Sequence, residues 1–434
     1  MPLNLIRRAL GAAALGALAL AAPAAAAPHV PGQVVVAYAG ANGASAGASA
    51  PPARVVHLRR GESLAAALQR LRRQPGVVSA EPNYIAHAAT PLIPDDPGRG
   101  GIDGWQLVQW NFLAQDGVDA PDAWANDAAV GRPGGKGVKI AVLDSGIAYK
   151  RWGRFRRSPD FAGTHFIQGS DFVDPGTPPV DRNGHGTHVA GTIAESTNNA
   201  LGVTGLAYRA SIMPVRVLDS QGYGNVATIA RGIRWAAKRG AQVINLSLVF
   251  PSEVRADEIP DILHALRYAR QHGALVVGAA GNDGEQAVAY PARADDVLSV
   301  GATTDDLCLA DYSNGGSRLD ISAPGGGNDS DLTGEPNCNP GATGRDIYQM
   351  TFDGSVRNFG LPSGYQGTSM AAPHVSGAAA LVIASGILGS HPTPAAVAQR
   401  LERTARDLGP PGRDQWYGAG MVDAGAATNP ALLP

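Results

Sequence analysis

Residues 140–146 read Ile-Ala-Val-Leu-Asp-Ser-Gly, a short apolar run that ends at an acid, a serine and a glycine. Four more short apolar runs follow along the chain, at residues 212–218, 243–248, 274–279 and 297–301. Helical patterns lie between some of them, at 226–239 and 259–272. Such alternation is typical of a parallel sheet with helices on both faces. The sequence therefore predicts an α/β fold whose ligand site lies at the carboxyl ends of the strands.

The acid that ends the first run and a glycine-flanked histidine are candidate reactive residues. Asp144 would be costly in a buried strand unless a partner compensates it, although a capping or turn aspartate explains this residue as well. His185 lies in Asn-Gly-His-Gly-Thr-His at 183–188, where the glycines leave the imidazole accessible. A core histidine is the simpler interpretation. A metal pair with His188 is disfavoured, because the motif lacks the glutamate of His-Glu-x-x-His.

A third motif carries a serine. Residues 367–375 read Gly-Thr-Ser-Met-Ala-Ala-Pro-His-Val. We expect Ser369 at the amino end of a helix, where N–H groups and the helix dipole favour negative charge, and Pro373 in the first turn. An N-cap serine is the simpler interpretation of this motif alone. A serine nucleophile needs a histidine base that a third group orients, and Asp144, His185 and Ser369 supply these groups in that chain order.

Together the three motifs resemble the signatures of the subtilisin-like serine endopeptidases, or subtilases, over about residues 105–426. The tail Tyr-Gly-Ala-Gly-Met-Val-Asp-Ala at 417–424 resembles that family as well. The resemblance implies a subtilisin-like parallel sheet and hydrolysis of peptide bonds through an acyl-enzyme. It implies that Asp144 orients His185, that His185 acts as general base and acid, and that Ser369 attacks the scissile carbonyl.

The same resemblance implies residues that would hold the substrate. Asn282, in Ala-Ala-Gly-Asn-Asp-Gly at 279–284, matches the family's oxyanion-hole asparagine, although a turn alone explains it as well. The implied substrate-binding residues are Gly222, Tyr223, Gly224, Ser247, Leu248, Val249, Gly281 and Asp283, with residues 289–291. Many family members have glycine where Val249 stands, so its bulk narrows the mouth of the first pocket. We hypothesise that Asp283 favours a basic residue before the cleaved bond.

A calcium site is also implied by resemblance. Residues 197–203 read Thr-Asn-Asn-Ala-Leu-Gly-Val and are similar to the family's calcium loop. The implied ligands are the Asn199 side-chain oxygen, the Asp160 carboxylate and the carbonyl groups of Thr197, Leu201 and Val203. Asp96 is a further candidate. Hard oxygen ligands suit calcium, and an ordinary asparagine-rich turn is the alternative.

The first 27 residues are expected to be a secretory signal that is removed. Arg7 and Arg8 precede an apolar run at 9–22, and an alanine-rich stretch follows at 24–27. A membrane anchor is the alternative, but the run is shorter than the about 20 residues of a membrane span. We therefore expect an exported protein with no membrane anchor after the signal is removed.

The cysteine count and the charge restrict the class of protein. Two cysteines exclude a disulfide-dense scaffold and a four-cysteine zinc site. In an oxidising compartment we expect one disulfide between Cys308 and Cys338, with two free thiols as the alternative. The net charge of −2 shows no basic excess, which argues against a nucleic-acid partner.

Residues 28–89 form a small basic block of net charge +4, whereas residues 90–434 carry −8. Strands are expected near residues 33–38, 55–58, 77–80 and 84–86, a loose loop at 40–52, and a helix from Ser63. The block resembles a subtilase propeptide. Its positive charge and the negative charge of residues 90–434 suggest electrostatic complementarity between the two parts of the chain. We therefore expect an α+β, ferredoxin-like inhibitory unit, self-cleavage after Ala89, and then an irregular arm at 90–125 that begins the catalytic domain.

As a whole the sequence predicts a secreted, monomeric serine endopeptidase that acts on polypeptides and has its own propeptide as inhibitor. A narrow-specificity processing protease is one alternative, and a non-catalytic binding module on the same scaffold is another. An esterase or lipase is disfavoured, because Gly-x-Ser-x-Gly is absent around Ser369. The basic insertion at 150–157 is interpreted as a solvated loop or a site of autolytic nicking.

Overall fold

The computed structural model describes residues 29–38, 53–59, 61–84, 93–99 and 104–432. The chain divides into two compact units, Met1–Ala89 and Thr90–Pro434. The expected signal segment, the loop at 40–52 and the expected cleavage site after Ala89 lie outside the described residues. Of the helices that are described, none is long and apolar enough to cross a membrane.

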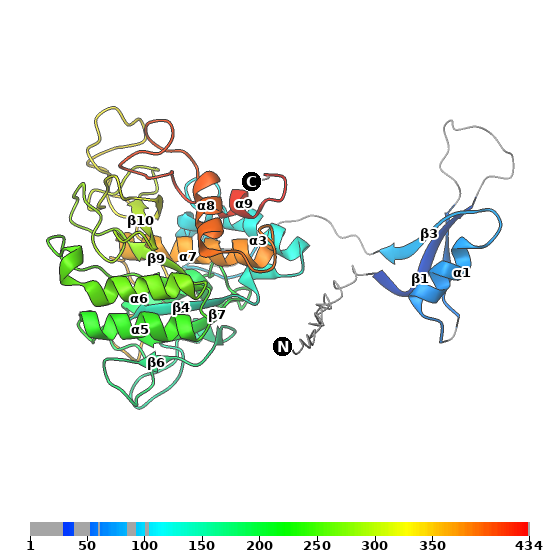
Figure 1. The fold of residues 1–434 in the computed structure, drawn as a ribbon, viewed down its shortest axis with the longest axis horizontal. Coiled ribbons are helices and arrows are strands. Elements are labelled where there is room, and N and C mark those ends of the chain that lie inside the picture. The colour runs from blue at the N-terminus through cyan, green and yellow to red at the C-terminus, as the bar shows by residue number, and fades with distance from the viewer. Residues whose placement is uncertain (1–28, 39–52, 60, 85–92, 100–103, 433–434) are drawn as a thin grey trace, which may run out of the picture. The chain divides into compact units, whose positions relative to one another are not determined.

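The first unit is an antiparallel sheet in the order β2-β1-β3 with a helix packed on it (Figure 1). Its elements are β1 (His29–Tyr38), β2 (Ala53–His57), α1 (Leu64–Arg72) and β3 (Val77–Tyr84). Ser63 caps α1 by accepting a hydrogen bond from the Ala66 amide. The small core consists of Val34, Val36, Ala67, Leu71 and Ala80.

The end of this unit differs from the sequence expectation. Residues 77–84 form one strand, not the two expected at 77–80 and 84–86. Pro82 cannot donate a ladder hydrogen bond, but it is tolerated because β3 is an edge strand that pairs with β1 alone. The described part of the unit is therefore an α+β arrangement with three strands and one helix.

The second unit is built on an eight-stranded parallel sheet in the order β11-β10-β9-β8-β4-β7-β5, with β6 beside β7. Its strands are β4 (Lys139–Asp144), β5 (His165–Phe166), β6 (Ser170–Asp171), β7 (Ser211–Arg216), β8 (Val243–Leu246), β9 (Leu275–Ala279), β10 (Val297–Thr303) and β11 (Ile321–Pro324). β12 (Thr351–Phe352) and β13 (Phe359–Gly360) form a separate antiparallel pair. The five apolar runs of the sequence are five adjacent strands of this sheet, β10, β9, β8, β4 and β7, as expected.

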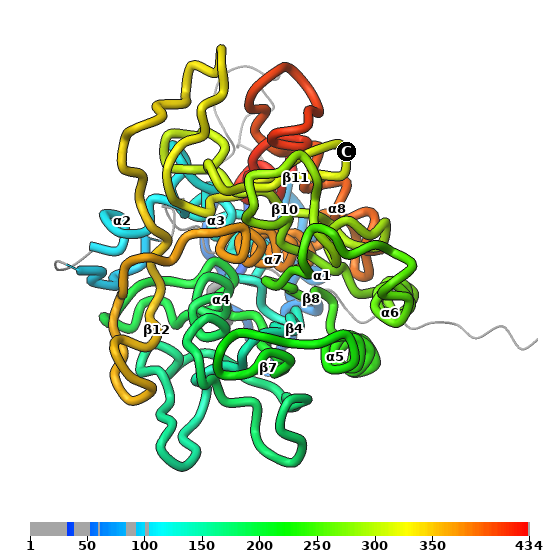
Figure 2. Tube along the Cα trace, turned by 90° about the vertical axis from the view of Figure 1, so that its left-hand side faces the viewer, coloured from blue at the N-terminus to red at the C-terminus, as the bar shows by residue number. Residues whose placement is uncertain are grey.

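Helices cover both faces of the sheet (Figures 1 and 2). One face packs against α5 (Val226–Lys238) and α6 (Pro260–Gln271). The other packs against α3 (Ala120–Ala129), α4 (His185–Ala194), α7 (Thr368–Ser385), α8 (Pro394–Arg403) and α9 (Ala424–Thr428). Because side chains alternate along a strand, Ile140 and Val142 enter the core around α7, whereas Ala141 and Leu143 enter the core around α5 and α6.

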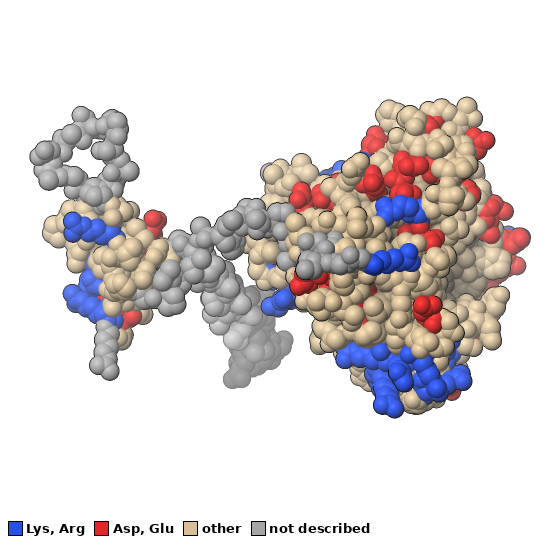
Figure 3. All heavy atoms as spheres, turned by 180° about the vertical axis from the view of Figure 1, so that it is seen from behind, with Lys and Arg blue, Asp and Glu red and all other residues tan. Residues whose placement is uncertain are grey.

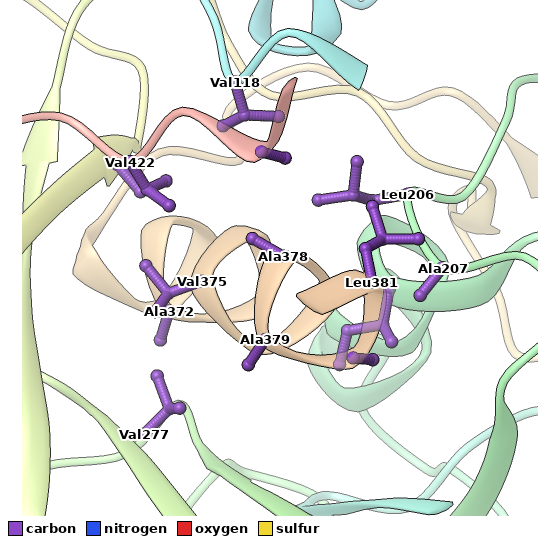
Figure 4. Packing of buried hydrophobic residues seen from close by; sticks show 14 of the residues in the cluster. Val118, Leu206, Ala207, Val277, Ala372, Val375, Ala378, Ala379, Leu381 and Val422 are labelled. Carbon is purple, nitrogen blue, oxygen red and sulfur yellow. The ribbon is translucent and has the colours of Figure 1, made fainter. Parts of the chain in front are cut away.

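Helix α7 is buried along nearly its whole length. Ala372, Ala378 and Ala379 are small enough for its neighbours to pack closely around it, among them Val277 and Val118 (Figure 4). Pro373 is the sixth residue of α7, so the expectation that it lies in the first turn was wrong. At that position proline removes a helical hydrogen bond to the carbonyl four residues earlier, which is that of Ser369.

The arm at 90–125 is also less irregular than expected. It contains α2 (Trp105–Val108), the 3-10 helix η1 (Trp110–Phe112) and the start of α3. Trp105, Trp110, Phe112 and Trp124 are buried in the core around α7, and this burial orders a segment whose Pro, Asp and Gly content suggested a loop.

Short connections complete the second unit. Three more 3-10 helices are η2 (Pro133–Gly135), η3 (Pro159–Phe161) and η4 (Ala256–Glu258). Cys308 and Cys338 form a disulfide with an S–S distance of 1.99 Å.

Candidate active site

The candidate acid and histidine meet where β4 ends and α4 begins. His185 Nδ1 lies 2.8 Å from Asp144 Oδ1 and 3.0 Å from Oδ2. Asp144 is fully buried, whereas the His185 side chain is 26% exposed and so remains reachable. Gly186 permits the approach, because a Cβ there would lie 2.2 Å from the Gly146 carbonyl oxygen. With Nδ1 directed at the acid, Nε2 becomes the basic nitrogen of the ring.

Asp181, which the sequence analysis did not identify, fixes the start of α4. It is fully buried and its carboxylate accepts five hydrogen bonds. The donors are Ser145 Oγ, the amides of Asn183, Gly184 and Thr187, and Thr187 Oγ1. Ser145 Oγ also accepts from the Gly186 amide at 3.0 Å, which ties the loop after β4 to the helix. An aspartate just before a helix start was the available signal.

Burial and nearby charge act in opposite directions on the pKa of His185. Burial lowers that pKa, whereas the charge of Asp144, its hydrogen bond and the charge of Asp181 raise it, and the net pKa is raised. The protonated ring is therefore stabilised at this position, as proton transfer from a nucleophile requires.

Ser369 lies in the first turn of α7, where N–H groups without helical acceptors face outward. Because Pro373 offers no donor to the Ser369 carbonyl, Ser247 Oγ donates to that oxygen at 2.7 Å. Asn245 of β8 donates to Ser247 Oγ at 2.9 Å and accepts from Ser376 Oγ at 2.8 Å. This network fixes the start of α7 to the end of β8 beneath the serine.

The Ser369 hydroxyl itself makes one weak contact. It donates to the Ser247 carbonyl oxygen at 3.3 Å, which is long for a hydroxyl donor. Among the described residues it has no hydrogen bond to His185. The hydroxyl therefore has to turn toward Nε2 before His185 can accept its proton, and such bonds often tighten only when substrate binds.

Asn282 is held in an orientation that leaves its amide nitrogen available. Its Oδ1 accepts from the Thr368 amide at 2.9 Å and from Thr368 Oγ1 at 2.8 Å. A Cβ at Gly367 would lie 3.4 Å from Asn282 Nδ2 and 3.7 Å from the Ser369 amide nitrogen. These two donors therefore border one small space, which the glycine keeps open.

The two expected substrate walls differ in exposure. Tyr223, flanked by Gly222 and Gly224, is 75% exposed in the loop before α5. On the other wall Leu248 is buried, whereas Val249 is 40% exposed. A bulky side chain thus stands partly exposed on this wall.

The residues after β9 combine a sharp turn with an exposed acid. Gly281 has a φ of +120°, and a Cβ there would lie 2.3 Å from Asn314 Nδ2. Asp283 is exposed and accepts a hydrogen bond from Ser252 Oγ at 2.8 Å.

His188 is a core residue in this structure. It is fully buried, its Nε2 lies 2.9 Å from the Ile347 carbonyl oxygen, and its ring stacks on Tyr365. Burial lowers its pKa to about 3. No group of three or more His, Cys, Asp or Glu side chains in the described part of the chain is arranged to hold a metal ion.

The candidate calcium loop surrounds two buried carboxylates. Asp160 accepts from Asn199 Nδ2 at 2.7 Å and from the Val203 amide at 3.0 Å. Asp96 accepts from the amides of Asn198 and Asn199, each at 3.1 Å. Burial raises the pKa of Asp160 to about 7 and raises the pKa of Asp96.

These residues fit a calcium ion with one adjustment. The carboxylates are hard oxygen donors in a buried place, where a cation would compensate them. Asn199, however, directs its nitrogen to Asp160, while its oxygen accepts from the Leu201 amide at 2.9 Å. The amide would have to turn over for its oxygen to face an ion beside Asp160.

Comparison with known proteins assigns this chain to a family. Residues 135–420 match the Subtilase family. The chain belongs to the subtilase family of serine endopeptidases. It is 40% identical over 295 residues, 68% of this chain, to an alkaline protease of Alkalihalobacillus alcalophilus and to Subtilisin Savinase of Lederbergia lenta. The aligned part spans 65% of the former, just under two thirds, and 91% of the latter.

A solved structure gives the same assignment for the fold. A protease from Pseudoalteromonas arctica PAMC 21717 superposes on this subtilase with a TM-score of 0.61 and 31% sequence identity. The superposition covers 78% of this chain and 99% of that one. The subtilisin-like fold expected from the sequence is confirmed.

Proposed function

We propose that this subtilase is a secreted serine endopeptidase that cleaves proteins with Ser369 as nucleophile. The observation that carries the proposal is the pairing of a buried Asp144 with His185 Nδ1 at 2.8 Å, which leaves Nε2 basic. Asn282 Nδ2 and the Ser369 amide supply donors beside the same helix start. A binding module would have no need for this complete set.

The reaction would proceed in two halves. His185 Nε2 takes the proton of Ser369 Oγ as that oxygen attacks the scissile carbonyl carbon, and the oxyanion accepts hydrogen bonds from Asn282 Nδ2 and the Ser369 amide. The C–N bond breaks, His185 gives its proton to the leaving amine, and the acyl group stays on Ser369. A water molecule that gives a proton to His185 then attacks the ester carbonyl. The bond to Ser369 Oγ breaks, His185 returns the proton to that oxygen, and the acid is released.

A phosphonyl fluoride tests the nucleophile directly. Ser369 Oγ would displace fluoride from phosphorus while His185 takes the proton, so the peptide that contains Ser369 should gain the mass of the phosphonyl group. Ser369→Ala should gain none, and His185→Ala should react far more slowly. The exposed Ser220→Ala is the matched control. Labelling at another serine, undiminished in Ser369→Ala, would contradict the proposal.

We also propose that residues 1–27 direct export and that residues 28–89 are an inhibitory propeptide removed by cleavage after Ala89. The boundary between the two compact units at Ala89 and Thr90 supports this division. So does the difference in charge, +4 for residues 28–89 against −8 for residues 90–434. Polypeptides, including this propeptide, are the proposed partners of a monomeric enzyme.

A structural calcium ion is proposed at the loop 197–203. Asp160, the carbonyl groups of Thr197, Leu201 and Val203, and a turned Asn199 amide would hold it, with Asp96 nearby. The ion would neutralise carboxylates that burial otherwise destabilises, and no step of the reaction involves it.

For substrate preference, we propose that Asp283 favours a basic residue before the cleaved bond. Its carboxylate is exposed beside the Asn282 turn and is held by one hydroxyl, from Ser252. The kcat/KM for Arg over Phe at that position should fall in Asp283→Asn. An Arg/Phe ratio of one in the wild type, unchanged in the variant, would contradict this assignment.

A further inference from the structure

The insertion after Asp144 folds into a small basic hairpin, residues 150–157. Trp152 and Phe155 pair through two backbone hydrogen bonds of 3.1 and 3.0 Å, and their rings stack. Exposed cations project from the turn or its two arms, and four of the five are Lys150, Arg151, Arg154 and Arg156. Figure 3 shows Lys and Arg side chains gathered at the end of the larger unit where Figure 1 draws β6.

These four cations have no carboxylate within 4.0 Å among the described residues, whereas Arg182 and Arg216 both lie within that distance of Asp171. Arg154 lies over the Phe155 ring, which fixes its direction without neutralising its charge. The fifth cation, Arg157, is occupied differently, since it donates to the carbonyl oxygens of Phe161 and Ala162. The basic hairpin is thus a local positive surface on a unit whose net charge is −8.

The hairpin is attached at its base and along one side to residues that flank His185 in the chain. The Ser158 amide donates to the Ala148 carbonyl at 2.7 Å and closes the base. The Ala148 amide donates to Thr187 Oγ1 of α4 at 3.0 Å, two residues after His185. Arg182, three residues before His185, lies over the rings of Trp152 and Phe155. A chain bound on the hairpin would therefore lie on a surface that is fixed to the segments on both sides of His185.

We propose that the basic hairpin is an exosite that binds acidic segments of polypeptide substrates and increases their cleavage. This proposal rests on the proposed function. It adds that the enzyme selects substrates by the charge of segments that lie outside the residues around the cleaved bond. Exposed ion pairs are individually weak. Several cations on one fixed turn, however, raise the encounter rate with an acidic chain and jointly bind it. Because the turn is already formed, little ordering is needed on binding.

The test uses enzyme expressed as the full chain and matured, with three substrates. One is a short uncharged peptide around the cleavage site. The other two are longer peptides with that site, one with four Asp or Glu residues on either side of it and one with Asn or Gln in their place. The quantity measured is kcat/KM for the acidic peptide divided by kcat/KM for its amide counterpart.

In the wild type this ratio should be about three- to tenfold at low salt and approach one near 0.5 M salt, where the screening length is only a few ångströms. The variant Arg151→Gln/Arg154→Gln/Arg156→Gln should bring the ratio to about one, and the same three changes to Glu should invert it. The short peptide should be cleaved equally by all.

The matched control is the variant Arg132→Gln/Arg267→Gln/Arg403→Gln. It removes three exposed charges elsewhere on the unit, located after α3, on α6 and on α8 in that order. It should keep the wild-type ratio. A wild-type ratio of one, or a ratio that the hairpin variant leaves unchanged, would overturn the exosite. Equal losses on all three substrates would assign the hairpin to the fold instead.

Hairpin-dependent binding to vesicles of anionic phospholipid, with a ratio of one on the peptides, would assign the surface to membranes and also overturn the proposal. Failure of the proposed function looks different. In that case the short peptide would not be cleaved by the wild type any faster than by Ser369→Ala.

Discussion

The active-site carboxylates and those around the loop 197–203 are all buried, but they are compensated in different ways. Asp181 accepts five hydrogen bonds, and Asp144 faces His185 and accepts from the Ser145 amide at 2.7 Å. Each negative charge in the active site is thus surrounded by donors that belong to the fold.

In the second group the charges are compensated less completely. Burial raises the pKa of Asp96, Asp160 and Glu195. The charge of Asp96 also raises the pKa of Asp160, and the charges of both raise the pKa of Glu195. One oxygen of Glu195 has no hydrogen-bond partner in the described structure. Hydrogen-bond donors from the chain can therefore fix a buried acid for chemistry, whereas a buried acid with too few donors is stabilised by a cation or a proton.

The largest expected effect comes from Asp144→Asn. The amide cannot hold His185 in the tautomer with a basic Nε2, so kcat/KM for a peptide should fall by about 10⁴-fold. The matched change in the other group, Asp160→Asn, should leave kcat/KM of the folded enzyme near the wild-type value. A similar loss of activity in both variants would remove the functional distinction between the two groups.

Asn282→Ala should cost about 10²- to 10³-fold in kcat with little change in KM, because its Nδ2 would act on the oxyanion and not on the bound substrate. Steady-state kinetics on one short peptide measures this split. A rise in KM with unchanged kcat would show that Asn282 binds substrate instead.

Asp181→Asn should have a smaller effect on rate and a distinct effect on pH dependence. In asparagine an NH2 group replaces one of the two acceptor oxygens, so the side chain cannot accept all five hydrogen bonds. The start of α4 is then held less well, and kcat/KM should fall by about tenfold. The charge of Asp181 raises the pKa of His185. The base must be neutral to act, so without that charge the acidic limb of the kcat/KM profile should move to lower pH.

The control for this shift is Asp174→Asn, which changes a half-buried acid paired with Arg182. It should leave the acidic limb in place. A limb that stays fixed in Asp181→Asn, or moves to higher pH, would contradict the electrostatic role of Asp181.

Removal of calcium should have the smallest effect on the chemistry. With excess chelator the Tm at pH 8 should fall by about 5–10 °C, and activity at 25 °C should persist. The pKa of Asp160 is raised to about 7, so below that pH the acid takes up a proton in the folded, metal-free protein. The free-energy cost of burying Asp160 in the metal-free protein therefore falls. The difference in Tm with and without calcium should become smaller as the pH is lowered from 8 to 5. The Tm of Asp160→Asn should not respond to chelator.

Much of this arrangement could be predicted from the sequence, because it depends on local patterns. Five apolar runs became five adjacent strands, and the motifs around Asp144 and His185 became a hydrogen-bonded pair. The arm before α3 could not be predicted in this way, since burial of its tryptophans against α7 overrides its composition. Pro373 was misplaced because the donor that replaces its missing N–H comes from Ser247, 122 residues from Ser369 in the chain. Asp181 had a local signal, an aspartate just before a helix start, and only its contact with Ser145 depends on the loop after β4 meeting α4.

The central claim is that Ser369 is a working nucleophile that also matures its own precursor. The most direct measurement is the intact mass and N-terminal sequence of the exported protein, wild type beside Ser369→Ala. We predict that the wild type begins at or near Thr90 and that Ser369→Ala retains residues 28–89. The same mature N-terminus in both proteins would contradict the account.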